Sequence, residues 1–287
     1  MKKCIAIILL LLSAIIAYAQ EYPIHIMEEG HIVVGVTIND SIPANFILDT
    51  GAGIMILSGK MYERIKDKVK SAGYHTGFRH DGDKISGEIY QVPSFAIGNE
   101  RVENLKMGVY PPLDGMGIDG LVSMKFFEDK PFTIDYPNGK LIFQDPNSLM
   151  VLAEKGEVGQ LGFHRNMDVS LDISIPICIN DKVHVNAQFD TGSGHDLYVV
   201  NPFFMQQLGM TESNTEASTY TTPISGTEIK DYIAKENKLR VCGTSASITS
   251  SIVFREGLIM EALVGSGIFK EGAITIDIPS ARFIIHK

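Results

Sequence analysis

Short runs of β-branched and other apolar residues, separated by turn residues, make up most of the chain. Residues 31–38 and 173–179 are two such runs, and an Asn-Asp pair closes each of them, at residues 39–40 and 180–181. Each pair leads into a second strand-like run, so each segment predicts a β-hairpin. Many such strands and few helices predict an all-β, barrel-like fold.

Helix signals follow each hairpin. Ser58 is suited to be the N-cap of a helix that ends near Gly73. The Asn-Pro pair at residues 201–202 combines an N-cap with a proline at the first helical position, and Gly209 is a stop signal.

The chain also repeats itself, which indicates an internal duplication. Three pairs of segments match in the same order at offsets of 141 or 142 residues: 45–53 with 186–194, 119–123 with 261–265, and 133–142 with 275–284. We therefore expect two lobes, residues 20–146 and 164–287. The linker between them, at residues 147–163, is expected to hold a short helix and a Gly-containing connector.

The most apolar stretch lies at the N-terminus. Lys2 and Lys3 precede the apolar residues 5–16, and Ala-Tyr-Ala follows at residues 17–19. This order predicts a secretory signal peptide over residues 1–19 rather than a buried helix or a membrane span. We expect an exported protein, periplasmic or extracellular, with no stable membrane span after cleavage.

Composition narrows the range of partners. With 45% hydrophobic residues the chain can bury a large core, and 25 basic against 34 acidic residues give a formal charge of -9. No run of like charges occurs, so nucleic acid is not an expected partner.

Two cysteines, Cys178 and Cys242, follow the expected cleavage point. They are equally consistent with a disulfide and with two small buried apolar residues. His184 and His195 flank Asp190, but their spacing matches no usual ligand set, so no metal site is expected.

The repeat contains two Asp-Thr-Gly triplets, at residues 49–51 and 190–192, each preceded by apolar residues and followed by a small one. They resemble the active-site turns of retropepsin-like and pepsin-like aspartic proteases. Residues 121–123 and 263–265 resemble the hydrophobic-hydrophobic-Gly element of that family. The resemblance covers essentially the whole exported chain and implies two acid-protease-like barrels formed by internal duplication, with a few short helices.

The resemblance also implies an aspartic endopeptidase in which Asp49 and Asp190 activate a water molecule, with no cofactor. Two carboxyl groups held close together cannot both ionise, so the pair keeps one proton and supplies both an acid and a base. Gly51 and Gly192 let the backbone approach these carboxyl groups.

Three further residues are expected to support the turns. By resemblance, the hydroxyls of Thr50 and Thr191 hydrogen-bond across to the opposite turn, and Ser193 donates to the nearby carboxylate. The first turn has Ala52 where the second has Ser193. Because Ala52 cannot donate, we expect Asp49 to be the more readily protonated carboxyl, with an activity optimum less acidic than that of pepsin.

Ser123 departs from the family pattern, which has glycine at this place, as at Gly265. Serine is small, so we expect a tolerated variant. The alternative is a non-catalytic exported protein that keeps the fold and binds peptides or proteins. Ser123 favours this alternative, whereas the two intact triplets favour the enzyme.

Residues 74–92, turning at residues 81–82, are a candidate for the hairpin flap that covers the substrate in aspartic proteases, although an ordinary surface hairpin fits equally well. Residues 220–232 are its counterpart in the second half. The expected substrate is an extended polypeptide bound between the lobes as an added strand. Because one chain carries both triplets, we expect a monomer.

Overall fold

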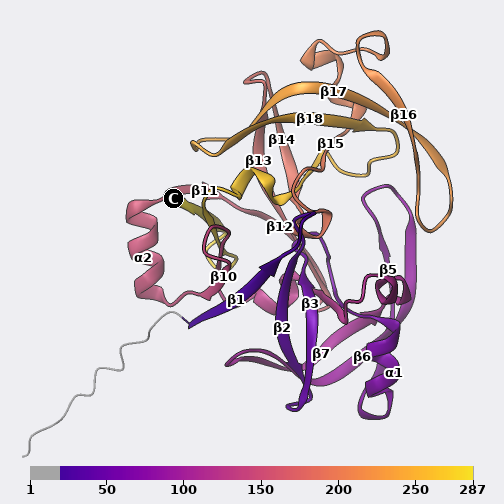
Figure 1. The fold of residues 1–287 in the computed structure, drawn as a ribbon, viewed down its shortest axis with the longest axis vertical. Coiled ribbons are helices and arrows are strands. Elements are labelled where there is room, and N and C mark those ends of the chain that lie inside the picture. Colours follow the sequence, from indigo (N-terminus) through magenta and orange to yellow (C-terminus); the bar gives the residue numbers. More distant parts are fainter. Residues whose placement is uncertain (1–19, 287) are drawn as a thin grey trace, which may run out of the picture.

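The computed structural model describes residues 20–286 (Figure 1), so the signal peptide expected at residues 1–19 lies outside the described residues. Strands dominate the described chain, and its helices are short. The prediction of an all-β, acid-protease-like fold with barrel-like sheets is therefore confirmed. Among residues 20–286, none of the helices has both the length and the apolar character needed to cross a membrane.

The strands of the first half form a barrel and part of a sheet beside it. They are β1 (Gln20–Ile26), β2 (Ile32–Ile38), β3 (Ile42–Leu48), β4 (Met55–Leu57), β5 (Lys70–Phe78), β6 (Lys84–Ile97), β7 (Glu100–Val109), β8 (Gly120–Val122), β9 (Phe132–Asp135) and β10 (Lys140–Phe143). The order around the barrel is β2-β3-β8-β4-β7-β6, and β6 pairs again with β2. Strand β8 lies parallel to β3 and antiparallel to β4.

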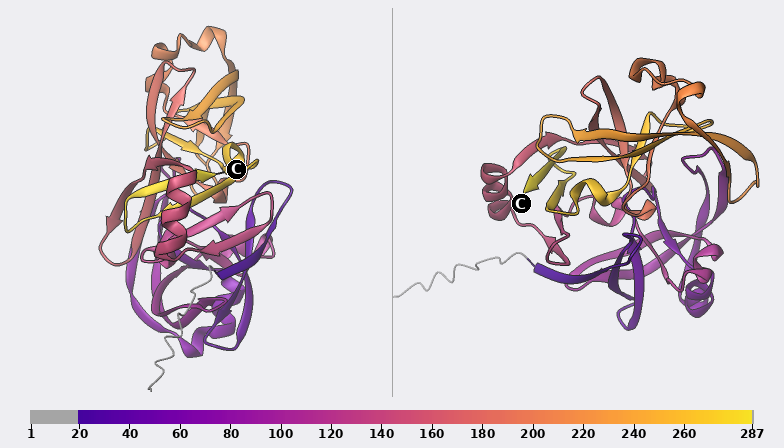
Figure 2. Two further views of the ribbon diagram at one scale, coloured as in Figure 1. Left: turned by 90° about the vertical axis from the view of Figure 1, so that its left-hand side faces the viewer. Right: turned by 45° about the horizontal axis from the view of Figure 1, so that its top comes forward.

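The second half has the same strand order, as a duplication requires. Its strands are β11 (Glu157–Gln160), β12 (Gly162–Asn166), β13 (Ser170–Ile179), β14 (Val183–Phe189), β15 (Tyr198–Val200), β16 (Glu216–Thr221), β17 (Glu228–Val241), β18 (Ser247–Arg255), β19 (Ala262–Val264), β20 (Ala273–Asp277) and β21 (Arg282–His286). The order is β13-β14-β19-β15-β18-β17, and β17 pairs with β13. Figure 2 shows this barrel above that of the first half.

A sheet between the barrels contains strands of both halves, in the order β11-β21-β20-β9-β10-β1. At its centre Thr133 on β9 pairs with Thr275 on β20, and their hydroxyl oxygens are 2.6 Å apart. These two threonines are equivalent residues of the repeat, so a pseudo-two-fold axis passes between them. Much of the expected linker at residues 147–163 is occupied by a helix and by β11, which pairs with β21.

The helical segments are short. They are α1 (Gly59–Ile65), η1 (Lys66–Lys68), η2 (Pro111–Gly115), η3 (Met124–Phe127), α2 (Pro146–Lys155), η4 (Thr191–Ser193), η5 (Pro202–Phe204), η6 (Gln206–Leu208), η7 (Glu212–Asn214) and η8 (Ser266–Phe269), where η marks a 3-10 helix. Ser58 caps α1 as predicted, by accepting a hydrogen bond from the Met61 N–H. The prediction that this helix continues to near Gly73 is wrong, because the chain from Lys70 onward pairs with β6 instead.

The predicted hairpin turns are confirmed. Asn39 and Asp40 have φ angles of 49° and 63°, and Asn180 and Asp181 both have 53°. Asn and Asp tolerate this left-handed region better than other side chains do, and it matches the twist of a two-residue hairpin turn. The turns reverse the chain into β3 and β14, and these two strands lead directly to the two triplets.

Cys178 and Cys242 form a disulfide with a Cα–Cα distance of 5.4 Å, which decides between the two interpretations of this pair. His184 lies near both sulfur atoms. Because the sulfurs are bonded to each other, neither is a thiolate able to ligate a metal.

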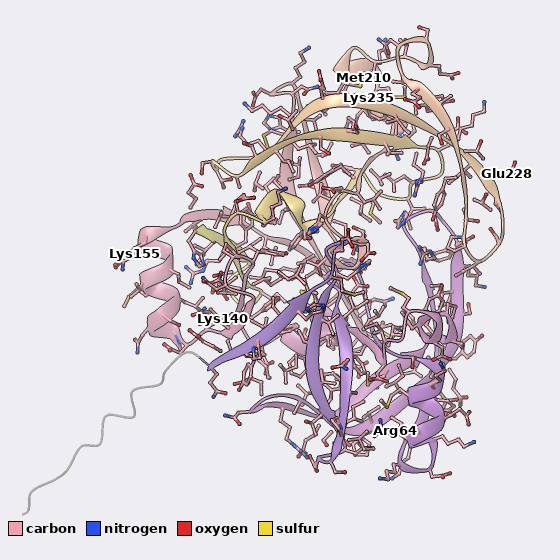
Figure 3. The ribbon with its side chains drawn as sticks, viewed as in Figure 1. Arg64, Lys140, Lys155, Met210, Glu228 and Lys235 are labelled. Carbon is pink, nitrogen blue, oxygen red and sulfur yellow. A yellow bond between two sulfur atoms is a disulfide. The ribbon has the colours of Figure 1, made fainter. Side chains whose placement is uncertain are left out.

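One continuous apolar core runs through both barrels and the central sheet. Charged side chains such as Arg64, Lys155 and Lys235 lie on the outer surface (Figure 3). The two triplets are therefore held by a core that belongs to both halves.

Candidate active site

The two triplets meet at the pseudo-two-fold axis through a reciprocal set of hydrogen bonds, here called the threonine lock. The Thr50 N–H donates to Thr191 Oγ1 at 3.1 Å, and the Thr191 N–H donates to Thr50 Oγ1 at 3.0 Å. Each hydroxyl then donates, at 2.6 Å, to a carbonyl of the other half: Thr50 to Phe189 and Thr191 to Leu48. Both threonines are fully buried, so the lock joins the turns without solvent.

Gly51 and Gly192 allow each turn to lie against the carboxyl group of the other. A Cβ atom on Gly51 would lie 2.3 Å from Asp190 Cγ, and one on Gly192 would lie 2.3 Å from Asp49 Cγ. Such distances are far inside van der Waals contact. Glycine is therefore required at both positions for the two carboxyl groups to come together.

The carboxyl groups of Asp49 and Asp190 are in hydrogen-bonding contact. Asp49 Oδ1 also accepts from the N–H groups of Gly51 at 3.0 Å and Ala52 at 2.9 Å, and Asp190 Oδ1 accepts from the Ser193 N–H at 3.1 Å. These donors orient both carboxyl groups toward the shared contact.

The surroundings raise the pKa of both carboxyl groups. Burial raises the pKa of Asp190 well above its ordinary value, and the adjacent charge of Asp49 adds to this rise. Burial also raises the pKa of Asp49, but hydrogen bonds from Asp190 and from two backbone N–H groups oppose that rise. Burial thus favours a proton on the pair, and the adjacent charge adds to this effect at Asp190.

The reason for expecting Asp49 to be the more readily protonated carboxyl does not hold in this structure. It assumed that the Ser193 hydroxyl donates to the Asp190 carboxylate. The hydroxyl instead donates to the backbone carbonyl of Asp190 at 2.9 Å. The Asp190 carboxylate therefore receives no hydrogen bond from the Ser193 hydroxyl. Having Ala52 in place of a serine puts Asp49 at no disadvantage in this respect.

Ser123 fits beside the first turn. It is fully buried, and its Oγ accepts a hydrogen bond from the Lys125 N–H at 3.2 Å, which caps η3. Its counterpart Gly265 has no such room, because a Cβ there would lie 2.5 Å from the Gly194 carbonyl oxygen. The two halves differ here without displacing the Asp49 turn.

Asp49 and Asp190 line a cavity of about 1360 Å³ between the halves. Two side chains hydrogen-bond the glycine carbonyls of the triplets. His31 Nε2 lies 3.0 Å from the Gly192 oxygen, and Gln188, which lines the cavity, donates from Nε2 to the Gly51 oxygen at 3.1 Å. No motif in the sequence identifies His31 or Gln188. The only available signal is their position: Gln188 lies on β14, which leads into the second triplet, and His31 comes directly before β2.

The β5–β6 hairpin covers this cavity, and its tip contacts the loop between β16 and β17 (Figure 1). Asp83 accepts from the backbone N–H groups of Ile224 at 2.8 Å and Ser225 at 3.2 Å. Asp81 accepts from the Tyr220 hydroxyl at 2.9 Å. We call these contacts between residues 79–83 and residues 220–225 the hairpin clasp.

A buried ion pair supports the clasp from the second half. Arg255 lies 3.5 Å above the Tyr220 ring and pairs with Asp231 at 2.7 Å. Asp81 is itself fully withdrawn from solvent and lies 3.5 Å from Arg79. Tyr74, at the start of the candidate flap, is by contrast 70% exposed and faces away from the cavity.

The fold and the paired triplets define an acid-protease-like architecture. Comparison with known families extends this for the first half: residues 34–126 match the family described as aspartyl protease. The match includes the first triplet and Ser123, so this part of the chain is similar to aspartyl proteases. No curated protein matches the chain.

Replacing Thr50 with valine tests the threonine lock. Valine keeps the shape but leaves the Thr191 N–H and the Phe189 carbonyl buried without partners, so we expect a loss of about 2–4 kcal/mol in the free energy of unfolding. Urea unfolding measures it. Thr50→Ser, which retains the hydroxyl, should lose much less, and equal losses in both variants would contradict the lock.

Asp190→Asn should unfold at a higher temperature than the wild type at pH 7. A carboxyl whose pKa is raised on folding stabilises the native state below its unfolded pKa, and this contribution is lost as the pH rises through the folded value. The difference should therefore shrink toward pH 3. Melting curves of Asp168→Asn, which breaks an exposed 2.7 Å ion pair with Lys106, provide the control and should not show an increase.

Asp83→Ala should loosen the hairpin clasp, because the N–H groups of Ile224 and Ser225 lose their acceptor. We expect faster hydrogen–deuterium exchange in residues 76–86 and 221–227, measured by mass spectrometry. Asp67→Ala, an exposed carboxylate in η1, is the matched control. Exchange in these two segments that is the same in both variants would show that Asp83 does not hold the hairpin.

Proposed function

We propose that this protein is an aspartic endopeptidase that hydrolyses peptide bonds with a water molecule activated by Asp49 and Asp190. The observation that carries the proposal is the contact between these two carboxyl groups in one cavity, with the pKa of Asp190 held well above its ordinary value. One proton shared by two carboxyl groups is the arrangement that acid–base hydrolysis requires.

The roles follow from where the proton lies. Asp49, ionised and held by the N–H groups of Gly51 and Ala52, accepts a proton from the attacking water. Asp190 donates its proton to the carbonyl oxygen of the scissile bond, so that a tetrahedral intermediate forms. Asp49 then donates its proton to the leaving nitrogen, and Asp190 takes a proton back from one hydroxyl of the intermediate as the C–N bond breaks. The products are a carboxylic acid and an amine, and the pair is again singly protonated.

The size and cover of the cavity favour a polypeptide substrate. At about 1360 Å³ it exceeds the range of about 300–1,000 Å³ common for small-molecule pockets. The β5–β6 hairpin roofs it and is fastened by the hairpin clasp. The clasp has to open to admit a chain and close again to exclude water during the reaction.

We further propose that the protein is exported, periplasmic or extracellular, and acts as a monomer in which each lobe supplies one carboxyl group. The disulfide between Cys178 and Cys242 supports export, since such bonds persist mainly in oxidising compartments. The threonine lock within a single chain supports the monomer, because no second copy is needed to complete the dyad.

Incubating the exported form with an unfolded protein between pH 2 and pH 8 tests the enzyme. We expect cleavage with an optimum well above pH 2, and a loss of roughly 10²–10⁴-fold in Asp49→Asn and in Asp190→Asn. Asp168→Asn should cleave like the wild type.

Cleavage that survives in both active-site variants would contradict the dyad. A folded wild type that cleaves nothing at any pH but binds peptides would favour the non-catalytic binding protein.

A further inference from the structure

Asp172 on β13 places a third carboxylate in the cavity that contains Asp49 and Asp190. Its Oδ1 lies 2.9 Å from the position that a Cβ on Gly53 would occupy, so it sits beside the loop that follows the first triplet. The repeat aligns Asp172 with His31, which hydrogen-bonds the other turn. The second half thus has an acidic side chain where the first half has an imidazole.

The Asp172 carboxylate lacks a partner within residues 20–286. Neither a hydrogen bond nor an ion pair reaches it, and burial raises its pKa. Other partly or fully buried carboxylates near the cavity are satisfied, as Asp81 and Asp83 are in the hairpin clasp. Withdrawing a carboxylate from water is unfavourable unless a donor or a cation compensates it.

Two histidines face Asp172 from neighbouring elements. His164 on β12 stands directly opposite it in the strand pairing, and His75 reaches toward it from β5 of the covering hairpin. Neither forms an ion pair with Asp172 among the described residues. The space between these three residues and the dyad is open to the substrate.

We propose that Asp172 is a specificity-determining residue that binds a lysine or arginine side chain of the substrate close to the scissile bond. This rests on the proposed endopeptidase function. A guanidinium or ammonium group from the substrate supplies the missing charge-assisted hydrogen bonds, and arginine can bind the carboxylate in two places. An uncharged side chain of similar length leaves the carboxylate unsatisfied and binds less well.

Cleavage of a peptide library by the wild type should show lysine and arginine enriched at one position beside the cleaved bond. In Asp172→Asn the kcat/KM for such peptides should fall roughly ten- to a hundredfold relative to the matching glutamine peptides, mainly through KM. Asp168→Asn, the same change four residues earlier and outside this cavity, should keep the preference. A wild type without this enrichment, or an enrichment that survives in Asp172→Asn, overturns the proposal.

Binding of uncleavable peptides separates this proposal from the proposed chemistry. Calorimetric titration measures the binding of peptides that have a reduced scissile bond and either arginine or glutamine at the enriched position. If the wild type cleaves nothing, the arginine or glutamine is placed at each central position in turn. Tighter arginine binding that is lost in Asp172→Asn supports the subsite even if the wild type cleaves nothing. Equal affinities overturn it even if cleavage is observed.

The pH dependence of the same titration adds a readout that a purely structural role would not produce. The arginine preference should grow as the pH rises through the raised pKa of Asp172, because its carboxyl group then becomes charged. His75, His164, Asp49 and Asp190 also face this space. Asp172→Asn should unfold no more easily than the wild type, since the substitution removes an unpaired charge. An arginine preference that does not change with pH would contradict the role of Asp172.

Discussion

The threonine lock is the constraint on which the rest of the structure depends. The hydroxyls of Thr50 and Thr191 each accept a hydrogen bond from the backbone of the other half of the chain, and both residues are fully buried. Because each hydroxyl both accepts and donates, a shift of either barrel would break several buried hydrogen bonds together. The Thr133–Thr275 contact lies on the same pseudo-two-fold axis and fixes the orientation of the barrels at a second point.

A duplicated single chain can depart from symmetry where two identical subunits cannot. The lock itself is symmetric to within 0.1 Å in its backbone donors. Around it the halves diverge: His31 contacts a triplet carbonyl, whereas its counterpart Asp172 in the cavity has no hydrogen bond or ion pair with residues 20–286. Symmetric glycines thus bring the carboxyl groups together, and the asymmetric surroundings give the two sides of the cavity different chemistry.

The features that the sequence predicts correctly are those encoded by residues close together in the chain. The Asn-Asp turns depend on the φ angles of two residues, and the repeat is visible because both copies kept their triplets. The end of α1 was not predictable, since Lys70 joins a strand through its pairing with distant residues. For the same reason no local pattern indicates the Ser193 hydroxyl bond, the hairpin clasp or the position of Asp172, all of which arise only once the barrels face each other.

Both the hairpin clasp and the pair of carboxyl groups depend on pH. Burial opposes ionisation of Asp83, but hydrogen bonds from Ser225 and Ile224 outweigh this effect and hold its pKa below the ordinary value. The contribution of Asp83 to the clasp is therefore lost only as the pH falls through that lowered value. Burial lowers the pKa of His80 to about 4. The folded hairpin tip therefore loses stability as the pH falls from about 6.5 toward 4, because the unfolded chain binds a proton at His80 more readily. The raised pKa of Asp190 favours its protonated form. Acid therefore loosens the cover through His80 while it favours a proton on the two carboxyl groups beneath that cover.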